Sequence, residues 1–125
     1  MAKVLYIDDN HDNRMLAMRV LMASDYDFEF VEADNAFDGI ELAASDPPDI
    51  ILMDISMPDM DGLTATARIR EIPELDAVPV VALTANAMQG DKERTLAAGC
   101  DGYIRKPVDI DRFPDEIMNY IGGRR

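Results

Sequence analysis

The chain contains 125 residues, a length that suits one domain with one sizeable core, so we expect a single domain over residues 1–125. Apolar residues make up 48% of the sequence, which indicates a globular fold rather than a disordered chain. The formal net charge of −13, from 25 acidic and 12 basic residues, repels nucleic-acid phosphates and anionic lipid headgroups, and so argues against nucleic acid and membranes as direct partners.

Short apolar strands alternate with amphipathic helices along the whole chain. Strands are expected at 3–7, 28–33, 50–54, 78–85 and 102–107, and helices at 13–24, 36–45, 62–72, 87–99 and 109–121. In the first helix, methionines recur at helical spacing, which favours core packing over a cofactor site. Alternation over 28–33 is typical of an edge strand, whereas the unbroken apolar run before Asp54 is typical of a strand buried on both faces.

Two residues mark the ends of the later helices. Gly99 is expected to cap the fourth helix at its C-terminus, and Pro114 is expected in the first turn of the fifth. Strands that alternate with helices form a parallel sheet covered by helices on both faces, with right-handed crossovers. The fold class is therefore α/β, and a functional site is expected beyond the carboxyl ends of the strands.

Cysteine usage and the N-terminal residues bear on the compartment. Cys100 is the single cysteine, which excludes an internal disulfide and fits a reducing environment. Because it follows Gly99 between two apolar segments, we expect a small buried core residue rather than a nucleophile. No apolar run approaches the ~18 residues of a membrane span, and no signal peptide is evident, so a cytoplasmic location is expected.

Polar residues with suitable chemistry lie at the carboxyl ends of four of the five expected strands: Asp8 and Asp9, Asp54, Thr84, and Lys106. Three carboxylates brought together repel one another unless a cation lies between them. Oxygen ligands without nearby His or Cys favour a hard ion such as Mg²⁺. His11 is close in sequence, but we expect it at the surface. Solubility explains the overall acidity as well as such a cluster does, and composition leaves both interpretations open.

A hydroxyl and an ammonium beside a divalent cation suit a phosphoryl group better than a metal alone. Asp54 would then be the nucleophile that forms an acyl phosphate by in-line attack. Taken singly, each acid is better explained by helix capping or solvation. The agreement of five residues at four strand ends favours the phosphoryl site.

Four segments carry a resemblance to a known family: "YIDDNHDNR", "DIILMDISMPDMDG", "VVALTANA" and "GYIRKP". In this order and spacing the chain resembles, over essentially its whole length, the receiver domain of two-component response regulators. The resemblance implies a flavodoxin-like doubly wound fold, with five parallel strands in the order 2-1-3-4-5 and five helices, an order for which a chemotaxis member of the family is a known example.

The resemblance also implies a role for each matching residue. Asp54 would be the phosphoacceptor, Asp9 a direct Mg²⁺ ligand, Asp8 a ligand through water, and the backbone carbonyl of Ser56 a third protein ligand. Thr84 would move toward the phosphoryl oxygens, and Lys106 would pair with those oxygens. The peptide bond between Lys106 and Pro107 would be cis. Asn86 and Ser56 would tune the phosphoryl lifetime.

Tyr103 has two interpretations. From the residues alone it is a half-buried ring on a strand. The resemblance implies a switch aromatic that turns inward after Thr84 moves, within a surface of helix four, strand five and helix five that includes Met88 and Leu96.

We therefore expect a stand-alone response regulator that accepts a phosphoryl group from a histidine kinase or a histidine phosphotransfer protein. Its only chemistry would be self-phosphorylation and self-dephosphorylation, and its output would be protein contact, as a monomer or a phosphorylation-dependent dimer. A receiver excised from a hybrid histidine kinase looks the same in sequence. A Mg²⁺-dependent phosphohydrolase would want an acid where Ser56 stands, and a degenerate scaffold would not need the five intact residues.

Overall fold

The computed structural model describes residues 1–85 and 89–123, with the backbone alone for 89–92. Asn86 and Met88, and the first two residues of the helix expected at 87–99, lie outside the described residues. None of the described helices combines the length and apolar character needed to cross a bilayer.

Five parallel strands form one sheet in the order β2-β1-β3-β4-β5. The strands are β1 (Ala2–Ile7), β2 (Phe28–Ala33), β3 (Ile50–Asp54), β4 (Val80–Thr84) and β5 (Gly102–Arg105). The helices are α1 (His11–Met22), α2 (Ala36–Ser45), α3 (Gly62–Arg70), α4 (Gln89–Ala97) and α5 (Phe113–Gly123), with a 3-10 turn η1 at Pro73–Leu75. The expected fold class and strand order are confirmed, and β2 is an edge strand as its alternation predicts.

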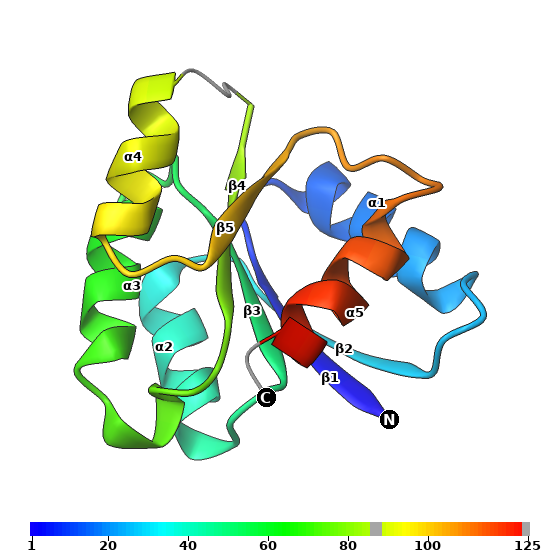
Figure 1. Ribbon diagram of the computed structural model, residues 1–125, viewed down its shortest axis with the longest axis horizontal. Helices are drawn as coiled ribbons and strands as arrows, with labels where there is room; N and C mark the ends of the chain where they lie inside the picture. The colour runs from blue at the N-terminus through cyan, green and yellow to red at the C-terminus, as the bar shows by residue number, and fades with distance from the viewer. Residues whose placement is uncertain (86–88, 124–125) are drawn as a thin grey trace.

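The helices cover both faces of the sheet, with α1 and α5 on one side and α2, α3 and α4 on the other (Figure 1). Two apolar cores result, one beneath each helical layer. Every residue of β3 and β4 is buried, which is why these strands are apolar without alternation. Cys100 is buried in the core beneath α2 and α3, as expected.

Side-chain caps set most helix starts. Asn10 accepts the Asn13 N–H at 2.9 Å, so α1 begins at His11, two residues earlier than predicted. The last helix begins at Phe113 rather than at 109, because Asp109 accepts the N–H groups of Asp111 and Arg112 in a turn of its own. Pro114 therefore falls in the first turn of α5, as expected.

Several other boundaries and one core assignment differ from the sequence pattern, as the first and fourth helices also end two residues earlier than expected. The third helix ends at Arg70 rather than 72, because the chain turns there into η1. The fourth and fifth strands are shorter than 78–85 and 102–107. Met22 is 51% exposed, so the expected methionine packing was wrong for this residue, which lies at the exposed C-terminal end of α1.

Gly62 allows α3 to start directly against the end of β3. A Cβ placed on Gly62 would overlap the Asp54 carbonyl oxygen and lie 2.7 Å from the Ile55 Cα. Both are backbone atoms, which cannot rotate away as a side chain can. At the other end of the fold, Gly99 ends α4 with a φ of 108°, a left-handed conformation that glycine adopts without strain.

Replacing Gly62 with alanine should therefore destabilise the protein, by about 1–3 kcal/mol if the cost resembles that of other overpacked sites. Chemical denaturation would measure the change. Gly122→Ala in α5 is the matched control, because a Cβ there meets nothing within 4 Å, and should be neutral or slightly stabilising. Equal stability of the two variants would contradict the close approach.

Candidate functional site

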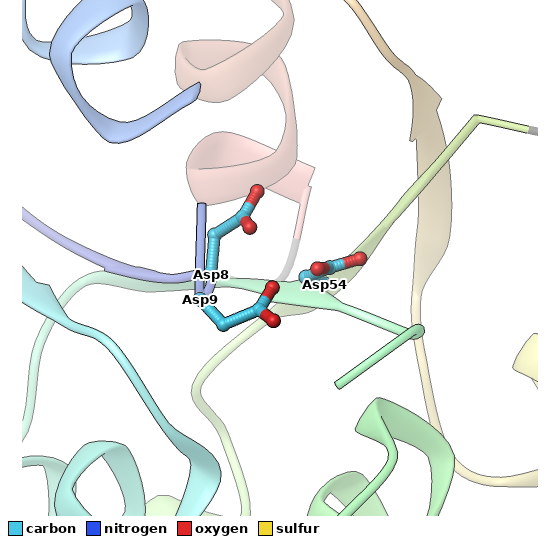
Figure 2. Close-up of side chains that lie close together, drawn as sticks. All are labelled: Asp8, Asp9 and Asp54. Atoms are coloured by element: carbon cyan, nitrogen blue, oxygen red, sulfur yellow. The ribbon is translucent and has the colours of Figure 1, made fainter. Parts of the chain in front are cut away.

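Three carboxylates gather at the carboxyl ends of the adjacent strands β1 and β3. Asp8 and Asp9 follow β1, and Asp54 is the last residue of β3. One oxygen from each lies within 4.8 Å of the others, and Figure 2 shows the three side chains facing a common space. β1 and β3 are adjacent and parallel, so their carboxyl ends meet at the same edge. The expected convergence of these residues is present.

The Asp8 carboxylate is fully buried and engaged on both oxygens. Its Oδ1 accepts the Asn10 N–H at 2.9 Å, and its Oδ2 accepts the Asn13 side-chain amide at 3.2 Å. The Lys106 ammonium lies 3.6 Å from the same Oδ2. Arg14 donates to the Asp8 backbone carbonyl at 2.7 Å and pairs with Glu32. These contacts fix both the backbone and the side chain of Asp8.

Asp54 is held differently. It is 2% exposed, and both of its hydrogen bonds fall on Oδ1, from the Ser56 N–H and from the Lys106 ammonium, each at 3.1 Å. No donor among the described residues bonds to its Oδ2. One oxygen of Asp54 is therefore anchored, and the other is available to react.

The electrostatics of the site favour a proton, or another cation, on Asp54. Burial raises the pKa of its carboxyl group to about 6, and the negative charge of Asp8 adds to that rise, whereas the Ser56 N–H and Lys106 act in the opposite direction. Two carboxylates that share one ammonium are thus only partly compensated.

Lys106 reaches the carboxylates from the loop that follows β5. Its backbone N–H donates to the Thr84 carbonyl at 2.7 Å, which ties this loop to the end of β4. The Lys106–Pro107 peptide bond is cis, as expected. Lys106 therefore contacts the ends of three strands, through Asp8, Asp54 and Thr84.

Thr84 and Ser56 lie at the ends of the strands next to the carboxylate cluster. Thr84 is 4% exposed and Ser56 is exposed. Together with Asp61 and Arg94, they line a hollow of about 350 Å³ beyond the ends of β3 and β4. None of the carboxylates of the cluster lines this hollow, which begins at the residue that follows Asp54.

Tyr103 is half-buried on β5, packed against the core beneath α2 and α3. It pairs with Ala82, two residues before Thr84. Because side chains alternate along a strand, Tyr103 and Thr84 project from the same face of the sheet. Leu96 on α4 is 46% exposed. His11 is exposed, as expected, and does not belong to the carboxylate cluster.

The donor set fits a small divalent cation. The cluster offers carboxylate oxygens from two buried residues and one exposed residue, so a cation could reach it from solvent through Asp9. Hard oxygen ligands favour Mg²⁺ or a similar ion. The backbone carbonyl of Ser56 belongs to the segment directly after Asp54.

Sequence reasoning missed Asn10, Asn13 and Arg14, which hold Asp8 in place. All three lie within the segment "YIDDNHDNR". The available signal was an asparagine at the helix cap and another three residues on, directly after a strand that ends in an acid. That pattern indicates a cap, but not that a side chain turns back toward the acid.

Known proteins similar in sequence and structure show which family this site belongs to. A family model for the response regulator receiver domain matches residues 4–118. The chain belongs to this family. Receiver domains act in phosphorylation-based signalling rather than as enzymes that turn over a substrate.

Three relatives illustrate the likeness of this receiver domain to known proteins. The polar-differentiation response regulator DivK of Brucella anthropi is 40% identical over 119 residues, which cover 95% of each chain. The receiver domain of the sensor histidine kinase PA1611 from Pseudomonas aeruginosa, solved with a magnesium ion coordinated in its active-site cleft, is 31% identical, with a TM-score of 0.87 and coverage of 97% and 98%. The chemotaxis protein CheY4 of Vibrio cholerae is 25% identical, with a TM-score of 0.87 and coverage of 96% and 98%. The magnesium-bound relative and the carboxylate cluster together suggest a metal site in this receiver domain.

Asp54→Asn should stabilise the metal-free protein at pH 8 by up to about 3 kcal/mol, the free energy of a two-unit pKa shift. The folded-state pKa is raised, so the wild-type carboxyl loses stability as pH rises from about 4 through about 6, and the advantage of asparagine should vanish near pH 4. Urea titrations with EDTA at both pH values would measure this. Asp59→Asn, at an exposed position in the same loop, is the control. An Asp54→Asn variant no more stable than wild type at pH 8 would contradict the shift.

Proposed function

We propose that this receiver domain accepts a phosphoryl group on Asp54, in a Mg²⁺-dependent reaction, from the phosphohistidine of a histidine kinase or a histidine phosphotransfer protein. The observation that carries the proposal is the contact of one ammonium, that of Lys106, with both buried carboxylates. Such a cation compensates the charge of the site and remains available to a phosphoryl oxygen.

The hydrogen bonds support Asp54 as the nucleophile of the proposed reaction. Asp8 has both oxygens occupied, and Asp9 is exposed, where water competes with any donor. Asp54 keeps Oδ2 without a described donor, while its Oδ1 is held by Ser56 and Lys106. A carboxylate fixed at one oxygen presents the other in a defined direction, as in-line attack requires.

In the transfer, the Asp54 oxygen forms a bond to phosphorus as the bond from phosphorus to the donor's imidazole nitrogen breaks, and the leaving imidazole takes up a proton. Mg²⁺, when bound by Asp9, Asp54 and the Ser56 carbonyl and through water by Asp8, would neutralise charge on the carboxylates and on the transferred group. Lys106 pairs with a phosphoryl oxygen in place of the Asp54 Oδ1, and Thr84 supplies a hydroxyl donor.

The signal would leave the site along the face of the sheet that Thr84 and Tyr103 share. Movement of Thr84 toward the phosphoryl group would vacate space beside Ala82, next to the Tyr103 ring. The ring would then turn inward and alter the surface of α4, β5 and α5, which includes the exposed Leu96. A downstream protein would recognise that surface.

Of the alternatives, a Mg²⁺-dependent phosphohydrolase is disfavoured by Ser56, which stands where such an enzyme would need an acid. A receiver within a hybrid histidine kinase has support from the likeness to the PA1611 receiver. We favour the stand-alone regulator, acting as a monomer or a phosphorylation-dependent dimer in the cytoplasm, because the DivK relatives match over 95% of both chains.

Incubation with Mg²⁺ and a small acyl phosphate or phosphoramidate should attach one phosphoryl group, located at Asp54 by mass spectrometry of peptides. Asp54→Asn and EDTA should each abolish labelling, and Asp59→Asn should not. Rapid multiple turnover of ordinary phosphomonoesters would favour a hydrolase instead. No label on wild-type protein under any condition would favour a scaffold without phosphoryl chemistry.

Thr84→Val should accept a phosphoryl group but fail to transmit it, because valine keeps the shape of threonine and lacks the hydroxyl. Hydrogen exchange with and without donor would measure this, and the change expected in β5 and α5 of wild type should be absent. Thr64→Val is the control, since the Thr64 hydroxyl is exposed and bonds to Asp61. A wild-type response in Thr84→Val would remove Thr84 from the switch.

A further inference from the structure

We propose that Asn13 is a positioning residue for the metal site: it orients the Asp8 carboxylate and thereby makes the site prefer Mg²⁺ to Ca²⁺. This inference rests on the proposed function, which supplies the metal. It assigns to Asn13 a role of its own in that site, through a side-chain contact with a carboxylate five residues earlier in the chain.

The first step is the direction of the Asn13 side chain. Asn13 is the third residue of α1, and its N–H bonds to the Asn10 side chain at 2.9 Å. This cap holds the backbone of Asn13 in the first helical turn. The side-chain amide then points back to the Asp8 Oδ2, at 3.2 Å. Asn10 therefore acts on both residues, since its N–H also bonds to the Asp8 Oδ1.

The second step is what the amide does to Asp8. A carboxylate that is 0% exposed must have its charge and orientation supported by nearby donors. Lys106 is 3.6 Å away and is shared with Asp54, to which it lies closer, at 3.1 Å. Asn13 is a neutral donor that contacts Asp8 and not Asp54. When Lys106 turns to another oxygen, Asn10 and Asn13 still hold the Asp8 plane.

The third step concerns the ion. Mg²⁺ demands nearly ideal octahedral geometry, whereas Ca²⁺ accepts more ligands in a flexible arrangement. Because both Asp8 oxygens are held, the water through which Asp8 would reach the ion has a fixed position. Fixed ligand positions favour Mg²⁺, which tolerates less variation in coordination geometry than Ca²⁺ does. Partners that orient a direct ligand commonly change metal affinity by tenfold or more. Asn13 would act on a carboxylate that reaches the ion through water, so its effect should lie at or below the lower end of that range. Loss of the Asn13 amide should thus weaken Mg²⁺ more than Ca²⁺.

The test is calorimetric titration of Asn13→Ala with Mg²⁺ and, separately, with Ca²⁺, at one pH and ionic strength. Mg²⁺ binding should weaken by up to about tenfold, and the ratio of Mg²⁺ to Ca²⁺ affinity should fall. Alanine keeps the N–H that Asn10 caps and favours the helix slightly, so the variant should fold. His11→Ala, at an exposed position in the same turn, is the matched control and should keep the wild-type ratio.

A double-mutant cycle shows whether Asn13 acts through Asp8. Thermal melts of the metal-free protein should show that Asn13→Ala lowers Tm in the wild-type background and has a much smaller effect beside Asp8→Asn. The inference would be overturned if Asn13→Ala left the ratio of Mg²⁺ to Ca²⁺ affinity unchanged, or if it changed Tm equally in the wild-type and Asp8→Asn backgrounds. Either result would leave the proposed function intact. Failure of the unmodified protein to bind Mg²⁺ would overturn the metal site itself, and the role of Asn13 with it.

Discussion

The pairing of the Lys106 ammonium with two buried carboxylates is the interaction on which the site depends. Removing a carboxylate from water costs several kcal/mol unless a partner compensates its charge, and here Asp8 and Asp54 share one cation. Three carboxylates and one ammonium leave the pocket two negative charges from neutrality when all are ionised. Burial is the main cause of the raised pKa of Asp54, and the charge of Asp8 adds to it. The remaining negative charge favours a divalent cation at the cluster.

The parallel sheet makes this concentration of charge possible. Only in a parallel arrangement do successive strands deliver their last residues to the same edge. β1, β3 and β4 lie side by side in the centre of the sheet, and their ends bring together Asp8, Asp54 and Thr84. Apolar cores on both faces keep those ends in fixed positions. The fold therefore supplies the rigidity that a charged, uncompensated pocket lacks on its own.

The three carboxylates differ in their surroundings, which suits them to different tasks. Asp9 is exposed and accessible to an ion from solvent. Asp8 is buried and held at both oxygens, and Asp54 is buried and held at one. Burial and hydrogen bonding, rather than residue type, distinguish the three carboxylates, and in the proposed function they suit Asp9 to bind a cation, Asp8 to stay fixed and Asp54 to react. The same residue type thus meets three requirements within a few ångströms.

The sequence by itself determined the fold class and the gathering of Asp8, Asp9, Asp54, Thr84 and Lys106, because an apolar run followed by a polar residue states where a buried strand ends. The sequence misplaced the end of α3 at Arg70 and the start of α5 at Phe113, because local turns decide those limits. It also wrongly predicted that Met22 is buried, because this residue lies at the exposed end of α1. Only the tertiary structure decided which oxygen of each carboxylate is engaged, how closely Gly62 meets the backbone of β3, and that Asn13 turns back to Asp8. Those outcomes depend on distances between segments that the chain brings together only when it folds, and no periodicity in the sequence encodes them.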